Sequence, residues 1–201
     1  MMLYRERLHE WRVPLLVFVL VWLHGAWFGL TDDEAYYWVL AQRLDWGYAY
    51  HPPMVAWLIA LSETLLGWLF GPHSVALVRL PGAVCAAGIV ALAIQWLRWA
   101  GVSVEQASRR GALAILSLVG LFSLSWMMVT DLALFLGWTV VFAATWRICF
   151  SSTVRWESYL ALAAGLVFAI LSKYSGVLAA VSSFGAILLW APRDRRVPGW
   201  G

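Results

Sequence analysis

The chain has 201 residues, of which 63% are apolar and 12% are charged, and its mean hydropathy is +0.76. Soluble domains contain about 45–50% apolar and about 25% charged residues, so this composition excludes an ordinary soluble domain. The formal net charge of +3 is small and scattered, which excludes nucleic acid as a partner. Cys85 and Cys149 lie in apolar runs and match no metal or redox spacing, so we expect buried thiols.

Six apolar runs approach the length of about 20 residues that a membrane-spanning helix needs. The predicted spans cover residues 13–30, 74–99, 111–128, 132–150, 156–172 and 175–190. The first run is longer than the core of a signal peptide and has no clear cleavage site, so we expect an uncleaved span. The predicted fold is an all-α integral membrane domain over residues 1–201, with about six transmembrane helices and a long outer loop at residues 31–73.

The basic residues predict how the chain is oriented in the membrane. The apolar run at 54–71 carries Glu63, and it could either cross the membrane or lie as a helix in its interface. If the run does not cross, 11 of the 14 basic residues fall on one side, and the other side holds only Arg43, Arg79 and Lys173. The positive-inside rule therefore favours a juxtamembrane helix here and cytoplasmic termini, in a multi-pass protein of the inner (plasma) membrane.

Acidic residues gather on the predicted outer face, where ionisable groups beside the membrane are candidates for function. Thr31-x-x-Glu34 has the spacing of a capping box, in which the two residues satisfy each other's backbone N–H groups. Capping alone does not account for three successive acids, Asp32, Asp33 and Glu34, beside the bilayer. The stretch is either a helix cap alone or, as we favour, a cap combined with a carboxylate that acts as a general base on an acceptor hydroxyl or helps hold a divalent cation.

Three later polar positions each allow a structural and a functional interpretation. His51-Pro52-Pro53 fixes an extended segment before a helix, so His51 is either a polar turn residue or part of the site. Asp131 stands at the start of the predicted fourth span and is either an N-cap or a second acid of the site. Lys173 is the chain's single lysine, and it either snorkels to the interface or holds a phosphate as a point charge.

The order and spacing of these motifs resemble the N-terminal half of a family of GT-C glycosyltransferases. The motifs are Asp33-Glu34-Ala35-Tyr36-Tyr37-Trp38, Trp46-Gly47-Tyr48, His51-Pro52-Pro53-Met54-Val55-Ala56-Trp57, Thr130-Asp131 and Leu171-Ser172-Lys173-Tyr174. The family, glycosyltransferase family 39 and its relatives, includes protein O-mannosyltransferases and lipid A aminoarabinose transferases. The resemblance extends over nearly the whole chain.

The resemblance implies a glycosyltransferase that moves a sugar from a polyprenyl-phosphate donor to an acceptor on the extracytoplasmic face. The site residues that it implies are catalytic Asp33, Glu34 and Asp131, and substrate-binding Lys173, His51 and Tyr37. Lys173 matches the lysine that contacts the lipid phosphate, and residues 54–71 match a juxtamembrane helix. The cofactor is left open, with a divalent cation as the candidate, and membrane lipid is an expected partner.

Two departures from the family pattern keep alternatives open. Relatives commonly carry an acid directly before the His-Pro-Pro element, where this chain has Tyr50, which weakens the case for a bound cation. Relatives also continue beyond six spans, so we expect either the N-terminal part of a larger GT-C module or a short member that needs a second membrane polypeptide. A non-catalytic subunit is therefore the alternative function. A transporter of a lipid-linked substrate is less favoured, because His24 is nearly the only polar residue inside the spans.

Overall fold

The computed structural model is entirely helical over the residues that it describes, which are 2–71, 73–117 and 126–192. These ranges hold eight α-helices and a 3-10 helix and no β-strand, which confirms the all-α prediction. The elements are α1 (Met2–Ala26), α2 (Asp32–Ala41), α3 (Met54–Phe70), α4 (Val75–Trp99), α5 (Val104–Ser117), α7 (Thr130–Phe150), α8 (Trp156–Ser172), η1 (Tyr174–Gly176) and α9 (Val177–Trp190).

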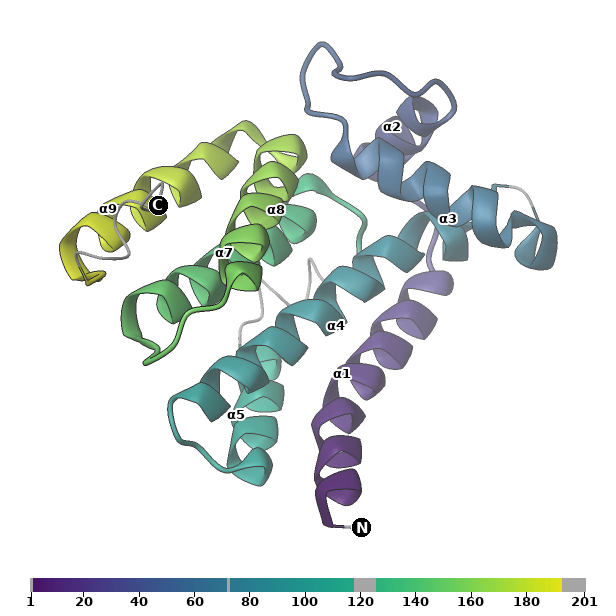
Figure 1. The fold of residues 1–201 in the computed structure, drawn as a ribbon. Coiled ribbons are helices and arrows are strands. Elements are labelled where there is room, and N and C mark those ends of the chain that lie inside the picture. The colour runs from purple at the N-terminus through teal and green to yellow at the C-terminus, as the bar shows by residue number, and fades with distance from the viewer. Residues whose placement is uncertain (1, 72, 118–125, 193–201) are drawn as a thin grey trace.

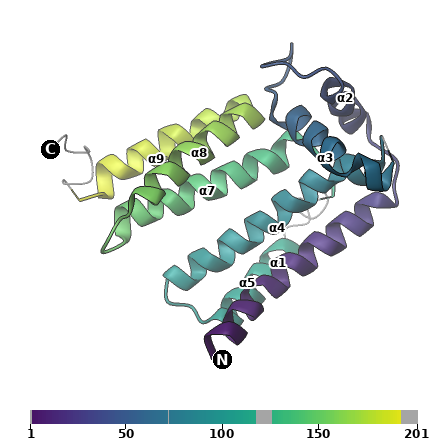
Figure 2. The ribbon, with the colours of Figure 1, turned by 45° about the vertical axis from the view of Figure 1, so that its right-hand side comes forward.

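The long helices form two packed groups that are joined through α4. α1 and α5 pack against α4, whereas α8 and α9 pack against α7, and α4 also contacts α7 (Figure 1). The short helix α2 and the helix α3 lie together at one end of the long helices, and the beginning of α1 and the end of α9 lie at the other (Figure 2). The segment predicted as an outer loop is therefore collected at a single end of the molecule.

The segment between α1 and α4 folds as the capping motif predicts. Thr31 is the N-cap of α2: its hydroxyl accepts a hydrogen bond from the Glu34 N–H at 3.4 Å, and its own N–H donates to the Glu34 carboxylate at 3.0 Å. α2 is tied to α3 through Glu63, whose carboxylate accepts from the Trp38 indole at 3.0 Å and from the Gln42 amide at 3.1 Å. Residues 31–73 thus contain two helices that are anchored to each other.

The membrane spans are confirmed only in part. In the described ranges, α4 and α7 are long and apolar enough to cross a bilayer, and shorter apolar helical stretches cover Trp11–Ala26, Met54–Phe70, Trp156–Ser172 and Tyr174–Trp190. α1 ends before the predicted boundary at residue 30, because carbonyl groups that follow the helix turn toward Arg79. α5 begins earlier than the predicted third span, and residues 118–125 of that span lie outside the described ranges. The number of six spans stays a prediction.

Small residues bring α7, α8 and η1 into close contact. A Cβ atom on Gly137 would lie 2.8 Å from the backbone nitrogen of Ala169, and one on Gly165 would lie 2.9 Å from the Val140 side chain. Gly176 approaches the carbonyl group of the same Ala169, so η1 folds back on the end of α8. Small residues let helix backbones approach closely, as membrane helices commonly do. This packing sets where the α8–η1 turn, which carries Lys173, stands relative to α7.

We expect Gly137→Ala to destabilise the fold by about 1–3 kcal/mol, because the new methyl group overpacks the contact between α7 and α8. At about 2–4 °C per kcal/mol for a chain of this size, the melting temperature in detergent falls by several degrees. Gly185→Ala on α9 is the matched control, since a Cβ atom there meets nothing within 4 Å. An unchanged melting temperature for Gly137→Ala would contradict the close packing.

Candidate active site

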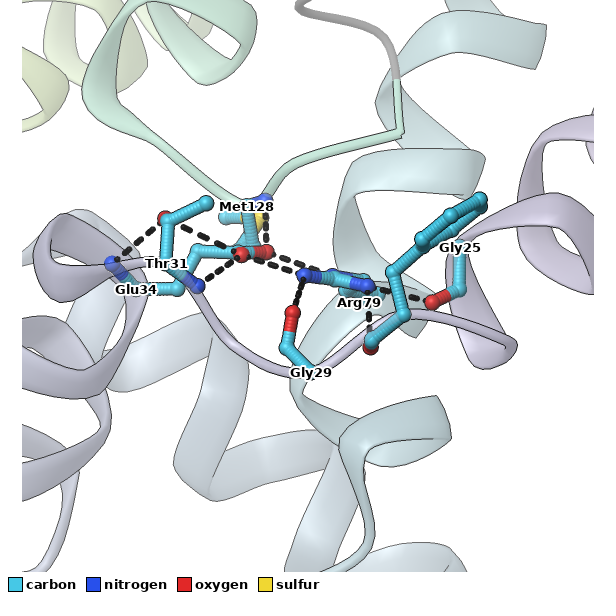
Figure 3. Close-up of polar contacts among 7 residues, drawn as sticks. Gly25, Gly29, Thr31, Glu34, Arg79 and Met128 are labelled. Carbon is cyan, nitrogen blue, oxygen red and sulfur yellow. Dashed lines mark hydrogen bonds and ion pairs between the residues drawn. The ribbon is translucent and has the colours of Figure 1, made fainter.

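A buried ion pair lies at the centre of the end where α2 and α3 are collected. Arg79 of α4 donates from Nε to Glu34 Oε1 at 2.7 Å and from a terminal nitrogen to Oε2 at 2.6 Å. The two side chains are 1% and 0% exposed. Such a bidentate pair fixes the relative orientation of both groups as well as their distance. Figure 3 shows the guanidinium group between the Glu34 carboxylate and the carbonyl groups of Gly25, in the last turn of α1, and Gly29, which follows α1.

The remaining donors of Arg79 hold the end of α1. One terminal nitrogen donates to the carbonyl oxygens of Gly25 and Phe28, and the other donates to Gly29 at 2.7 Å. A guanidinium group has five N–H donors, and five hydrogen bonds are formed here, so the buried cation is fully satisfied. The Trp126 ring covers it, with 4.7 Å between the guanidinium carbon and the ring centre. Arg79 therefore joins α4, the end of α1, and α2.

Both oxygen atoms of the Glu34 carboxylate also accept several hydrogen bonds. Besides Arg79, Oε1 accepts from the Met128 N–H at 3.0 Å, and Oε2 accepts from both the N–H and the hydroxyl of Thr31. Burial by itself raises the pKa of Glu34, but the hydrogen bonds from Arg79, Thr31 and Met128 outweigh it and lower the pKa below the usual value. The carboxylate is therefore ionised and shielded, and its oxygen atoms have no room for a substrate hydroxyl.

Burial of Glu34 turns Asp33 toward a different face of α2. Successive residues of a helix point about 100° apart, whereas residues four apart lie side by side. Asp33 is exposed and shares its face with Tyr37, which is buried. Burial raises the pKa of the Tyr37 phenol, a hydrogen bond with the Thr130 side chain opposes this shift, and the nearby charges of Asp33 and Asp131 add to it. The phenol thus stays protonated and lies within electrostatic range of both carboxylates.

His51 and the Asp131–Lys173 pair complete this arrangement. The His51 ring lies edge-on to Tyr37, with 5.3 Å between the ring centres. Lys173 Nζ donates to Asp131 Oδ1 at 2.7 Å, and both side chains are 37% exposed. The pair joins the first turn of α7 to the residue that follows α8. We call Asp33, Tyr37, His51, Asp131 and Lys173 the polar cluster.

The interpretation of Asp131 as an N-cap is wrong. The N-cap of α7 is Val129, whose side chain makes no capping hydrogen bond, and Asp131 stands inside the first turn. Its carboxylate is directed to Lys173 on another element instead of to its own helix. Lys173, in turn, contacts the carboxylate on the neighbouring helix α7 and does not merely extend toward the membrane interface. An ammonium group has three donors, and Asp131 takes one of them.

The sequence placed Asp131 and Lys173 on the same face, but it did not identify Arg79 as the partner of Glu34. The signal for Arg79 was present, because an arginine inside a predicted span requires a partner, and the predicted outer face is rich in acids. The backbone N–H of Met128 could not have been predicted from side-chain types as a second partner of Glu34. Thr130 was also missed as the group that touches Tyr37.

The carboxylates of the cluster do not form a cation cage by themselves. Within the described ranges, no group of three or more histidine, cysteine, aspartate or glutamate side chains stands together as metal ligands. Magnesium is held in many proteins by one or two carboxylates together with substrate phosphates. Asp33 and Asp131 are the cluster's candidates for that role, and a divalent cation stays an expectation from the sequence.

Over its described residues the chain is thus a bundle of apolar helices that carries acids and a lysine at one end. A family model described as dolichyl-phosphate-mannose-protein mannosyltransferase matches residues 50–198. The chain belongs to this family, which is membrane-embedded and of the GT-C type. The match confirms the resemblance seen in the sequence. Asp131 and Lys173 lie within the matched range, whereas Asp33 and Tyr37 precede it.

A curated relative covers nearly all of the chain. The chain is 32% identical, over 191 residues and 92% of its length, to a lipid A galacturonosyltransferase, RgtD, of Rhizobium johnstonii. The chain spans 36% of the length of that relative. No solved structure matches the chain.

We expect Arg79→Met to lower the free energy of unfolding by about 3–5 kcal/mol, because it leaves the Glu34 carboxylate buried without its cation. Arg155→Met is the matched control: Arg155 pairs with Glu157 on the surface, where such pairs contribute about 0–1 kcal/mol. Unfolding in detergent by a chemical denaturant measures both variants. Equal losses in the two variants would contradict a special role for the buried pair.

The lowered pKa of Glu34 predicts an acid-sensitive fold. A carboxyl group whose pKa is lower in the folded state stabilises the fold above its unfolded pKa of about 4.3, and this stabilisation is lost as the pH falls through the folded pKa. The melting temperature should therefore fall as the pH is lowered from 6 toward and below that range. Glu34→Gln should weaken this dependence, whereas Glu157→Gln on the surface should preserve it. The same pH profile in Glu34→Gln as in the native chain would refute the assignment.

Proposed function

We propose that this chain carries residues of a GT-C glycosyltransferase site, which transfers a sugar from a polyprenyl-phosphate donor to an acceptor hydroxyl. The observation that carries the proposal is the joining of Asp131 to Lys173, next to Tyr37 and the Asp33 face of α2. These residues come from three separate parts of the sequence and meet at one end of the helices. The membership of the GT-C family supports a reaction of this class.

Each residue of the cluster has a role in the proposed reaction. The Asp33 carboxylate accepts the proton of the acceptor hydroxyl while the hydroxyl oxygen attacks the anomeric carbon of the donor sugar. The bond between that carbon and the phosphate oxygen breaks, and the lipid phosphate leaves with the bonding electrons. Lys173 has further N–H donors beyond the one that Asp131 takes, and these stabilise the phosphate charge. Asp131 holds the ammonium group in place through their hydrogen bond.

Tyr37 and His51 contact each other beside these groups. The Tyr37 phenol stays protonated, so its hydroxyl group is available to donate a hydrogen bond to a substrate oxygen. The His51 ring packs against Tyr37 and against Tyr36, which holds the loop before α3 beside the cluster. We assign both residues to substrate binding. Glu34 is assigned to positioning Asp33, because its own oxygen atoms are occupied.

The proposed site faces the extracytoplasmic side of the membrane. The basic residues favour this orientation, because nearly all of them fall on the side of the termini. A site on that face does not meet nucleotide sugars, so a donor that reaches it through the membrane is required. The relative RgtD is named a lipid A galacturonosyltransferase, which makes a lipid-anchored sugar acceptor the first to be tested.

We expect Asp33→Asn to lower the rate of sugar transfer about 10²–10⁴-fold, the range typical of losing a general base. The matched control is Asp32→Asn, since Asp32 is an exposed neighbour with no assigned role. Transfer is measured in reconstituted membranes with a polyprenyl-phosphate sugar and lipid A. Lys173→Ala should lower the rate by about 10²-fold or more and also raise KM for the donor.

Transfer that is insensitive to Asp33→Asn would refute the catalytic role. A native chain that is inactive alone, but active with a second membrane polypeptide, would identify it as a subunit. In that case the Asp33→Asn chain, tested with the same polypeptide, distinguishes a catalytic subunit from a non-catalytic one.

A further inference from the structure

A cavity of about 320 Å³ lies between α4, α7 and α9, toward the opposite end of the helices from the polar cluster. The residues that line it include Trp96 of α4, Phe142, Thr145 and Trp146 of α7, and Ser183 and Ala186 of α9. Its α7 residues, Phe142 to Phe150, follow Asp131 by 11 to 19 positions, which is about 16–28 Å along the helix. The cavity is therefore separate from the proposed site of sugar transfer.

Thr145 brings an unpaired hydroxyl group to this cavity. The residue is 7% exposed, and within the described ranges its side-chain oxygen has no hydrogen-bond partner. Thr139, on the same helix, donates to the Phe135 carbonyl oxygen at 2.7 Å, which is a common arrangement for a threonine inside a helix. A buried hydroxyl group without a partner is costly, so its presence in a native fold requires a reason. A ligand atom that accepts a hydrogen bond inside the cavity supplies that reason.

Arg147 supplies a cation beside the cavity. Its guanidinium carbon lies 5.1 Å from the centre of the Trp99 ring, at the end of α4. Trp99 follows the lining residue Trp96 by three positions, so the charge lies about one helical turn beyond that wall of the cavity. Arg147 is partly buried and forms no ion pair with another described residue. Stacking on a ring uses the face of the guanidinium group and leaves the N–H donors at its edge for a phosphate.

The cavity lies near the cytoplasmic boundary of the membrane in the predicted orientation. Arg147 belongs to the basic residues that fall on the side of the termini. Three tryptophans, Trp96, Trp146 and Trp190, line the cavity, and indole rings favour the headgroup layer of a bilayer. Phe150 and Trp190, at the ends of α7 and α9, are 55% and 60% exposed, so the cavity can be reached from the surrounding lipid.

We propose that this cavity binds one acyl chain of an anionic phospholipid from the cytoplasmic leaflet. The phosphate group lies at the Arg147 guanidinium group, and the ester carbonyl, one glycerol unit away, accepts a hydrogen bond from the Thr145 hydroxyl group. The acyl chain then packs against the aromatic wall. Basic pockets between membrane helices on the cytoplasmic side bind anionic headgroups in this way. A volume of about 320 Å³ is at the low end for ligand pockets, so it holds part of one chain and not the whole lipid.

A lipid in this position stabilises the junction between the two packed groups of helices. α4 belongs to one group, whereas α7 and α9 belong to the other (Figure 1). A ligand that contacts all three helices binds only the assembled fold, so the melting temperature rises with the concentration of that ligand. Binding of this lipid requires no sugar transfer, so the site is independent of the proposed function.

The first test adds phosphatidylglycerol or phosphatidylcholine, with the same acyl chains, to the full chain in an uncharged detergent. We expect phosphatidylglycerol to raise the melting temperature at a concentration about 5-fold lower, because it alone carries a net negative charge. Arg147→Met should remove this preference, and Arg147→Lys should retain most of it. Arg155→Met is the matched control, since Arg155 pairs with Glu157 on the surface, and should keep the full preference. Equal effects of the two lipids on the native chain, or an undiminished preference in Arg147→Met, overturn the inference.

The second test compares phosphatidylglycerol that has ester-linked chains with its ether-linked analogue, which lacks the carbonyl groups. The native chain should bind the ester form several-fold more tightly. Thr145→Val should abolish this difference, whereas Thr139→Val should preserve it, because the Thr139 hydroxyl group is already bonded within its own helix. Equal affinity of the native chain for both forms, or an ester preference that survives in Thr145→Val, contradicts the hydrogen bond from Thr145.

Filling the cavity locates the site without changing a charge or a hydrogen bond. Ala186→Trp should remove the stabilisation by phosphatidylglycerol, whereas Val181→Trp, on the exposed side of α9, should leave it intact. Stabilisation that survives in Ala186→Trp shows that the lipid binds elsewhere and overturns the inference. A photoreactive residue at position 186 should crosslink to the lipid in membranes that contain phosphatidylglycerol. Crosslinking to a protein instead, either a second copy or another membrane polypeptide, would mean that a helix covers the cavity and would likewise overturn it.

Discussion

The ion pair between Glu34 and Arg79 is the constraint on which the rest of the site depends. A buried charge is tolerated only when its hydrogen bonds are satisfied, and here satisfying them requires groups from four places in the chain. The end of α1 supplies carbonyl oxygens, Thr31 and Met128 supply N–H groups, and α4 supplies the cation. The arrangement therefore specifies where α2 begins and where the segment before α7 runs. α2 carries Asp33 and α7 carries Asp131, so the ion pair positions both acids of the polar cluster.

The adjacent acids Asp33 and Glu34 have different surroundings, because Glu34 is buried in the ion pair whereas Asp33 is exposed. Because successive helical residues point in different directions, burying one carboxylate exposes the other at a fixed angle. The Met128 N–H bond to Glu34 then ties this helix start to the segment that leads, within three residues, to Asp131. Close packing of Gly137 and Gly176 against Ala169 brings Lys173 to the same end. Contacts beneath the cluster thus position its members, and the Asp131–Lys173 hydrogen bond then joins two of them directly.

The sequence predicted the helical class, the capping box of α2 and the convergence of Asp131 with Lys173, because each depends on local pattern or on charge placement along the chain. It did not predict the saturation of Glu34, which depends on backbone groups such as the Met128 N–H that no residue type reveals. The N-cap interpretation of Asp131 was wrong because a tertiary partner, Lys173, outcompetes the local cap. An apolar cavity lined by residues of α3, α4, α7 and α8 was also beyond the sequence, because only packing defines how these four helices face one another.

The central claim is that Lys173 holds the phosphate of a lipid-linked sugar, and the chain offers a direct measurement because it contains a single lysine. The protein is labelled with ¹⁵N at lysine and placed in a phosphate-free detergent with a polyprenyl-phosphate sugar. The ¹⁵N–³¹P distance is then measured by solid-state NMR dephasing. The account predicts a distance of about 4 Å or less between Nζ and the phosphorus, as a direct charge-assisted hydrogen bond requires. Bound donor that causes no dephasing of the Lys173 signal would contradict the account.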